Sequence, residues 1–171
     1  MIEPSDFATW FLKYYLPPMI ANAMPVLIEG RCRVDRGIVF IDGKPLLGRN
    51  KTWEGLLSGL TGAYIAGSII AYFTLDPGYP LISLGAGAFA LLGDLLGAFI
   101  KRRLGLKPGE PFIPLDQLDF ALASTLYYYT LGLPEFTLKP SYVVLSLILI
   151  LVLHITTNYL AYLAGLKRSK L

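Results

Sequence analysis

Three aspartates and a basic pair lie close together in an otherwise apolar part of the chain. Asp94 stands in the segment GDLLGAFIKRRLG, which also carries Lys101 and Arg102. Asp116 and Asp119 follow in PLDQLDF. A carboxylate inside a membrane costs roughly 2.5–3.5 kcal/mol on insertion scales, so a functional role is expected for Asp94, with a structural ion pair between helices as the alternative. We interpret residues 93–119 as an active site.

The aspartates predict a magnesium site. Asp116 and Asp119 are three residues apart, which places both carboxylates on one face of a helix. Capping of a helix N-terminus also explains Asp116, but it explains Asp119 less well, one turn further in. With Asp94 nearby, these hard oxygen ligands suit Mg²⁺, which normally completes its shell with water and substrate phosphates. The site therefore predicts a phosphate-bearing substrate.

Positive residues that could bind such a substrate lie in two segments. Arg49 and Lys51 belong to GRNKTWEG, and Lys101 and Arg102 end the segment around Asp94. Arginine grips phosphate in a bidentate manner, and lysine offers a mobile point charge. Thr52 and the following backbone amides could add helix N-terminal donors for an anion. The other arginines near these segments are interpreted as a basic surface that attracts anionic lipid: Arg31, Arg33, Arg36 and Arg103.

The composition predicts an integral membrane protein that must position these residues. Of 171 residues, 54% are hydrophobic and only 16% are charged, and the mean hydropathy is +0.56. A bilayer core of about 30 Å needs roughly 20 apolar residues in helical form. Five stretches qualify, which predicts an all-α fold in one domain over residues 1–171, with spans at approximately 7–28, 53–74, 80–101, 116–133 and 141–166.

The spans carry further local signals. Pro17, Pro18 and Pro25 should kink or break the first span. Three aromatic residues of that span are expected in a belt at the membrane–water interface: Trp10, Tyr14 and Tyr15. Glycines in the second and third spans predict close helix packing, including the GxxxG pair Gly93 and Gly97. The start MIEPSDFATWF lacks the features of a signal peptide and is taken as part of the first span.

The distribution of basic residues predicts the orientation. Six Lys and Arg residues lie in loop 29–52, four in 101–115 and three after the last span, so these regions hold thirteen of the fifteen. The positive-inside rule then places the N-terminus outside and the C-terminus in the cytoplasm. Within loop 29–52, Asp42-Gly43 between IVFI and KPLL predicts a small β-hairpin. The protein is expected in the cell membrane as a multi-pass protein with its active site facing the cytoplasm.

The segments GRNKTWEG, GDLLGAFIKRRLG and PLDQLDF together resemble the archaeal CDP-archaeol synthases, in matching order and spacing over most of the chain. The related CDP-diacylglycerol synthases carry a serine, a Lys-Arg pair and two aspartates as D-R-x-D. Lys101-Arg102 match the pair, and Asp116-Gln117-Leu118-Asp119 match the aspartates. Ala98 stands in place of the serine, and no His-Gly-Gly precedes Asp116, which favours the archaeal branch.

The resemblance implies transfer of CMP from CTP to 2,3-bis-O-geranylgeranylglycerol 1-phosphate, giving CDP-archaeol and pyrophosphate. It implies Mg²⁺ as the cofactor, held by Asp116 and Asp119 with Asp94 in support. The catalytic cations would be Lys51, Lys101 and Arg102. The residues implied to bind CTP are Arg49, Asn50, Lys51, Thr52, Lys101 and Arg102. CTP, the isoprenoid lipid phosphate and the bilayer are the expected partners, and a homodimer stays open.

Two other functions stay open on the sequence alone. Another CDP-lipid-using enzyme, a CDP-alcohol phosphotransferase, also uses aspartates at the membrane interface, but its D-G-x-x-A-R and D-x-x-x-D motifs are absent. A small ion transporter would use Asp94 with His154 and Asn158, which are one helical turn apart. Interhelical hydrogen bonding is the commoner use of such a pair. One cysteine, Cys32, excludes an internal disulfide, and no zinc, P-loop or nucleic-acid motif is present.

Overall fold

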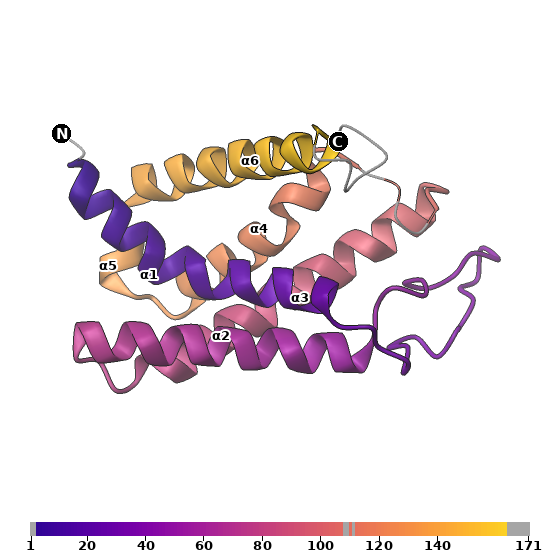
Figure 1. Ribbon diagram of the computed structural model, residues 1–171, viewed down its shortest axis with the longest axis horizontal. Coiled ribbons are helices and arrows are strands. Elements are labelled where there is room, and N and C mark those ends of the chain that lie inside the picture. The colour runs from indigo at the N-terminus through magenta and orange to yellow at the C-terminus, as the bar shows by residue number, and fades with distance from the viewer. Residues whose placement is uncertain (1–2, 108–109, 111, 164–171) are drawn as a thin grey trace.

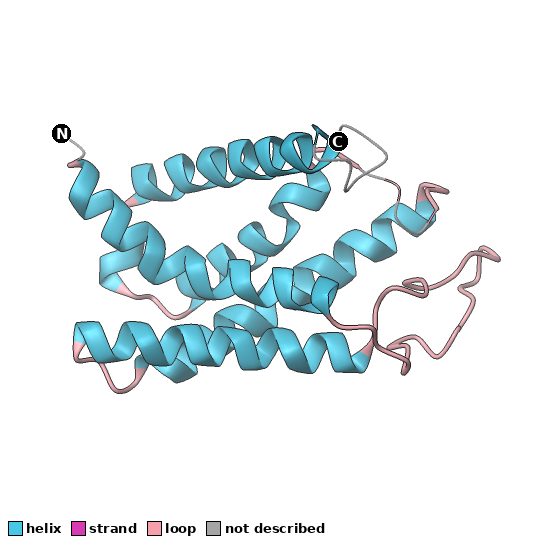
Figure 2. Ribbon diagram, in the orientation of Figure 1, coloured by secondary structure: helices cyan, strands magenta, loops and turns pink. Residues whose placement is uncertain are grey.

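The structure, a computed structural model, describes residues 3–107, 110 and 112–163, and this part of the chain is helical apart from its connecting loops (Figures 1 and 2). The long helices match the five predicted stretches closely, and two short helical elements lie between them. The elements are α1 (Pro4–Ala23), η1 (Met24–Leu27), α2 (Trp53–Thr74), α3 (Tyr79–Arg103), α4 (Leu115–Thr130), α5 (Pro134–Thr137) and α6 (Pro140–Leu163). The predicted end of the last span, 164–166, lies outside the described residues.

Three of the described helices are long and apolar enough to cross a membrane: α2, α3, and α6 over Pro140–Thr157. Their outer faces carry large apolar side chains that a water-soluble protein would bury, such as Leu57, Phe73 and Leu96. Such a surface is expected for helices whose solvent is lipid. The length and surface of these helices support a membrane location.

Two of the three prolines that were predicted to kink or break the first span do not end it. The helix continues through Pro17 and Pro18, both of which are buried. It ends at Ala23, and Pro25 lies near the start of the 3₁₀ turn η1, where its missing N–H costs no helical hydrogen bond. Of the three predicted positions, only Pro25 therefore lies where the helix ends.

Small residues let the helices approach closely, as predicted. A Cβ on Gly59 would collide with the Ala21 carbonyl of α1, and one on Gly93 would collide with the Asp119 carbonyl of α4. Gly87 of α3 packs against Ala63 of α2 in the same way. Without a hydrophobic driving force in lipid, such contacts between backbones are the main source of helix association.

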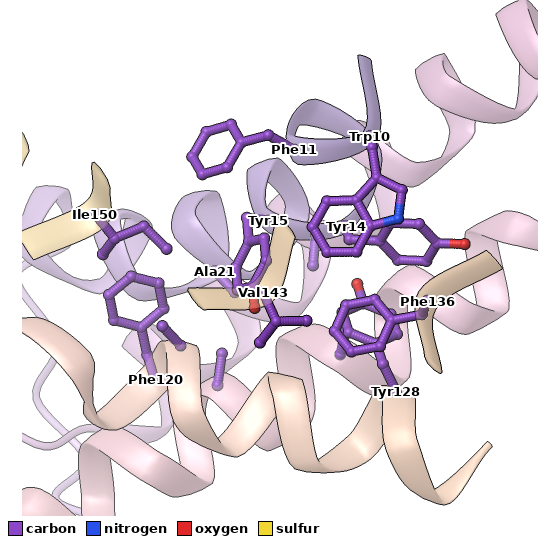
Figure 3. Close-up of a cluster of buried hydrophobic side chains, with 14 of the residues drawn as sticks. Trp10, Phe11, Tyr14, Tyr15, Ala21, Phe120, Tyr128, Phe136, Val143 and Ile150 are labelled. Atoms are coloured by element: carbon purple, nitrogen blue, oxygen red, sulfur yellow. The ribbon is translucent and has the colours of Figure 1, made fainter. Parts of the chain in front are cut away.

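An aromatic cluster joins α1 to α4 and α5 at the core (Figure 3). Trp10 stacks on Phe136 with ring centroids 5.1 Å apart, and Tyr14 meets Tyr128 edge-on at 5.1 Å. Trp10, Tyr14 and Tyr15 are at most 2% exposed. The predicted interfacial belt is therefore wrong for these residues, because tertiary packing against α5 supplies polar partners that the sequence did not reveal. Trp10 Nε1 donates to the Glu135 carbonyl at 3.0 Å.

The predicted β-hairpin in loop 29–52 is not formed, since no residue that the structure describes lies in a strand. The turn itself is correct: Gly43 has φ +76°, and the Phe40 N–H donates to the Lys44 carbonyl at 2.8 Å. Pairing stops at one isolated bridge between Val39 and Pro45. Proline has no N–H to continue a ladder, which explains why strands do not extend from this turn.

The loops that carry the predicted site lie at one end of the molecule. Figure 1 shows loop 29–52 beside the start of α2 and the end of α3. The connection between α2 and α3 lies at the opposite end, close to α5 (Figure 1). The alternating helix directions therefore gather the loops and helix ends that carry the predicted carboxylates and cations at a single end.

Candidate active site

Lys51 and Asp94 form an ion pair between the loop before α2 and the middle of α3. Lys51 Nζ lies 2.7 Å from Asp94 Oδ1 and 2.6 Å from Oδ2. Both side chains are about one quarter exposed, at 25% and 23%. The pair joins two segments that lie 43 residues apart in sequence, so the carboxylate in the apolar span has a defined positive partner.

A cavity of about 550 Å³ opens beside this pair. Its walls include Asp94 from α3. They also include four consecutive residues of the segment GRNKTWEG: Arg49, Asn50, Lys51 and Thr52. The volume falls in the range of about 300–1,000 Å³ that is usual for small-molecule sites. Arg49 and Asn50 are exposed at its rim. Four of the six predicted nucleotide-binding residues therefore line one common space, and Lys101 and Arg102 are not among its lining residues.

The start of α2 fixes the position of this wall. Thr52 is the N-cap of the helix, and the Gly55 N–H donates to its hydroxyl at 3.3 Å. A threonine at this position satisfies one of the free amides of the first turn. Thr52 is 8% exposed, so its hydroxyl is engaged in the fold, and its position sets the direction of Lys51 into the cavity.

A second ion pair joins the end of α3 to the start of α4. Lys101 Nζ lies 2.8 Å from Asp116 Oδ1 and 2.7 Å from Oδ2. Asp116 also accepts the Phe112 N–H at 2.9 Å from the loop before α4, whereas α4 has no side-chain cap, so capping does not explain this aspartate. Asp116 thus joins the start of α4 to the end of α3 and to the loop before α4.

Asp119 lies between these two pairs. Its carboxylate packs against Gly97 of α3, where an added Cβ would collide with Asp119 Oδ2. Asp94, Gly97 and Lys101 share one face of α3, spaced over about 10 Å. Asp119 interacts electrostatically with Asp94, Asp116 and Lys51. The charged groups therefore form a continuous row along the contact between α3 and α4.

The three aspartates do not form a closed metal cage. No group of three or more acidic, histidine or cysteine side chains in the described residues is placed to hold an ion. Lys51 and Lys101 each occupy both oxygens of one carboxylate. The donor chemistry still suits Mg²⁺, which is bound through one or two carboxylates plus substrate phosphates and water.

Arg102 is not among the residues that line the cavity. It is 5% exposed, and its guanidinium donates to the Lys107 carbonyl at 3.0 Å, which closes the turn after α3. Its Nε has no hydrogen-bond partner among the described residues. The structure thus brings Lys51, Asp94, Asp116, Asp119 and Lys101 into one row and leaves Arg102 on the adjoining face of α3.

Comparison with known proteins decides the family. The family described as "CarS-like: CDP-archaeol synthase" matches residues 6–170. A CDP-archaeol synthase of Staphylothermus marinus is 55% identical over 171 residues, covering 99% of this chain and 97% of that protein. One from Aeropyrum pernix is 45% identical over 157 residues, covering 90% and 86%. The chain belongs to the CDP-archaeol synthase family.

The fold agrees with this family. A solved structure described as an intramembrane enzyme for archaeal membrane lipids biosynthesis superimposes with a TM-score of 0.78 at 39% sequence identity. The match covers 86% of this chain and 91% of the solved one. The resemblance seen in the three sequence segments is confirmed, and membership of this family replaces the phosphotransferase and transporter alternatives.

Sequence reasoning missed Arg103, which had been assigned to the basic surface. Its guanidinium carbon lies 4.7 Å from the ring centroid of Phe40 and 4.9 Å from that of Phe99. It also contacts Asp42 at 2.8 Å and donates to the Pro45 carbonyl. Arg103 therefore anchors loop 29–52 to the end of α3. No sequence signal could have revealed a contact between residues about 60 positions apart.

Other residues of the cavity wall were also missed. Asn22 of α1 and the residues after η1, Glu29 and Gly30, line the cavity with Pro25 and Val26. Asn22 was detectable in principle as a polar residue in an apolar span. His154 lies 5.9 Å from Phe120 between ring centroids, in an edge-on contact. The side chain of Asn158 lies outside the described residues.

Proposed function

We propose that the chain transfers CMP from CTP to the phosphate of 2,3-bis-O-geranylgeranylglycerol 1-phosphate, giving CDP-archaeol and pyrophosphate. The observation that carries this proposal is the cavity where Arg49–Thr52 and Asp94 converge in a member of the CDP-archaeol synthase family. The triphosphate would enter this cavity, and the lipid chains would remain in the bilayer. Arg49, Asn50 and Thr52 would contact the nucleotide.

The reaction needs alignment more than a strong base. An oxygen of the lipid phosphate forms a bond to the α-phosphorus of CTP, and the bond from that phosphorus to the oxygen bridging the α- and β-phosphates breaks. Pyrophosphate leaves with the electron pair. Because the nucleophile is already an anion, catalysis consists of positioning and charge neutralisation.

The lysines would supply that neutralisation. Lys51 and Lys101 each hold a carboxylate in the row along α3. When CTP binds, we expect phosphate oxygens to replace these carboxylates as the lysines' partners, since lysine is a mobile point charge. We include Arg102 among the residues that would neutralise phosphate charge. Its buried Nε has no partner among the described residues, and it interacts electrostatically with Asp116.

Once the lysines bind phosphate oxygens, the aspartate carboxylates would be available to a divalent ion. Mg²⁺ would be held by Asp116 and Asp119, with Asp94 in support, and would offset charge on the phosphates. The carboxylates fit this use as hard oxygen donors on facing helices. The protein would cross the cell membrane five times with its N-terminus outside, so that this row faces the cytoplasm, where CTP is available.

Transfer of label from [α-³²P]CTP into lipid tests the proposal. The purified full chain in lipid nanodiscs receives the geranylgeranyl lipid phosphate and Mg²⁺. Asp119→Asn removes one negative charge from the row, and we expect turnover to fall roughly 10²–10³-fold, as for loss of a preorganised electrostatic group. Asp76→Asn is the matched control, because Asp76 lies in the α2–α3 turn and an amide oxygen can still accept the Gly78 N–H. Near wild-type turnover of Asp119→Asn would remove the metal assignment.

A further inference from the structure

A second cavity, of about 570 Å³, lies beside the start of α2 and is distinct from the one lined by Asp94. It is lined by Arg31, Cys32, Arg33, Arg36 and Trp53. We propose that this cavity, the arginine pocket, binds the phosphate of an anionic lipid head group. It takes no part in the proposed transfer reaction.

The arginines of the pocket are not paired with carboxylates among the described residues. None of its three arginines forms an ion pair with a residue in the described ranges. No acidic side chain lines the pocket. Three guanidinium groups around one space match the oxygens of a phosphate, because each can donate two parallel hydrogen bonds.

The two nearest carboxylates are committed to backbone amides. Glu54 accepts the N–H groups of Arg31 and Cys32 at 3.0 and 3.1 Å. Asp35 accepts three other amides of the loop, and the positive charge of Arg33 adds to these bonds in lowering the pKa of Asp35. These contacts hold the loop that carries the arginines and leave the guanidinium groups without a bonded anion.

The backbone of the arginine pocket is tied to a membrane helix. The Val34 N–H donates to the Lys51 carbonyl, and the Trp53 N–H donates to the Cys32 carbonyl, both at 2.9 Å. Arg33 and Thr52 form an antiparallel bridge between these contacts. The same short pairing therefore separates the arginine pocket from the cavity beside Lys51, and neither pocket depends on a free loop.

The position of Trp53 favours a lipid ligand over a soluble one. Trp53 is the first residue of α2, a helix long and apolar enough to span a membrane, and its side chain is half exposed. Tryptophan at a helix end marks the level of lipid head groups. Anionic head groups at that level attract nearby arginines. The pocket thus lies where lipid phosphates are concentrated.

Quenching of Trp53 fluorescence by brominated lipid tests this inference without CTP or lipid substrate. The full chain is placed in phosphatidylcholine nanodiscs containing the same mole fraction of brominated phosphatidylglycerol or brominated phosphatidylcholine. We expect the anionic lipid to be enriched near Trp53 by roughly fivefold or more. Trp53→Phe identifies the signal, because the other tryptophan, Trp10, is buried in the aromatic cluster.

Two triple variants separate a built pocket from a charged surface. Replacing the three arginines with glutamine should abolish the enrichment, and replacing them with lysine should weaken it, since lysine keeps the charge but loses the paired geometry. Full enrichment in the lysine variant would overturn the proposal of a specific phosphate pocket, because positive charge on the surface would then be sufficient to attract the lipid. No enrichment in the wild type would overturn the lipid ligand. If inorganic phosphate then still shifts Trp53 fluorescence, the pocket belongs to a soluble phosphate.

Discussion

At the scale of single residues, the ion pair between Lys51 and Asp94 is expected to function as a unit. Asp94→Asn leaves Lys51 one quarter exposed and without its carboxylate, and we expect turnover to fall about 10²–10³-fold. Lys51→Gln should cost a similar factor. Because the two residues act as a unit, the double variant should be no slower than the worse single variant, which a double-mutant cycle on label transfer measures.

The Lys13–Glu135 pair provides the control for this cycle. It has the same Nζ–oxygen distance, 2.6 Å, but joins α1 to α5. Lys13→Gln should change thermal stability and leave turnover unchanged. Additive losses in the Lys51 and Asp94 cycle would mean that the two residues serve the reaction separately.

Gly97 tests whether the position of Asp119 matters apart from its charge. In Gly97→Ala, the new methyl group would meet Asp119 Oδ2 and displace it from α3. Alanine also favours the helix by up to about 1 kcal/mol, so the fold should be retained. We expect turnover to fall by a factor of about 10², as for misplacement of a reacting group by 1 Å.

Gly78→Ala is the matched substitution, because a Cβ there meets only Asp76 Oδ1 at 3.5 Å, an ordinary contact. Circular dichroism checks the helix content of both variants. Wild-type turnover in Gly97→Ala would show that the Asp119 carboxylate need not lie against α3.

At the scale of elements, loop 29–52 is organised around Asp35. The Gly37, Leu47 and Gly48 amides donate to this carboxylate at 2.9–3.0 Å. Burial would raise its pKa, but the three backbone hydrogen bonds outweigh burial and hold the pKa below its usual value. The stability this contributes is present above the unfolded pKa of about 3.9 and is lost as pH falls through the lower folded pKa.

Asp35→Asn measures that contribution. An amide keeps only one oxygen acceptor, so we expect a loss of about 1.5–3 kcal/mol at neutral pH. The difference in thermal midpoint between wild type and variant should be constant from pH 7 to about pH 5 and shrink below about pH 4. A difference that does not depend on pH would mean that the carboxylate charge is not what holds the loop.

The elements also show which parts of the fold local sequence could predict. Helix positions followed from apolar length, and the close glycine contacts at Gly93 and Gly97 followed from their spacing. Burial of Trp10 could not be predicted, because an aromatic residue near a span end suits lipid and protein equally. The anchoring of the loop by Arg103 depends on Phe40 and Phe99, which only the folded chain brings together.

The candidate site was predictable in its residues but less so in their contacts. The sequence named no partner for Asp94 in the alternative of a structural ion pair, and the structure shows that Lys51 from the loop before α2 is that partner. Lys101 pairs with Asp116. Spacing along one helix limits which groups share a face, but the choice between partners depends on how α2 and α4 pack against α3.

At the scale of the whole molecule, the helix directions and the distribution of basic residues support the same orientation of the chain in a membrane. Loop 29–52 and the end of α3 lie at one end, and the α2–α3 turn lies at the other (Figure 1). α4 is only 16 residues long, about 24 Å, so a fourth crossing by this helix would need a locally thinner membrane or flanking residues that reach the interface. A five-span arrangement would therefore depend on packing as well as on hydropathy.

The single cysteine makes the orientation measurable. Cys32 is exposed in loop 29–52, which the positive-inside rule places in the cytoplasm. A membrane-impermeant maleimide should therefore leave it unlabelled in intact spheroplasts and label it after permeabilisation. In Cys32→Ser with Asp76→Cys, the thiol lies at the opposite end of α2, and labelling should occur in intact spheroplasts. The reverse pattern would invert the topology and place the row of Lys51, Asp94 and Asp119 away from cytoplasmic CTP.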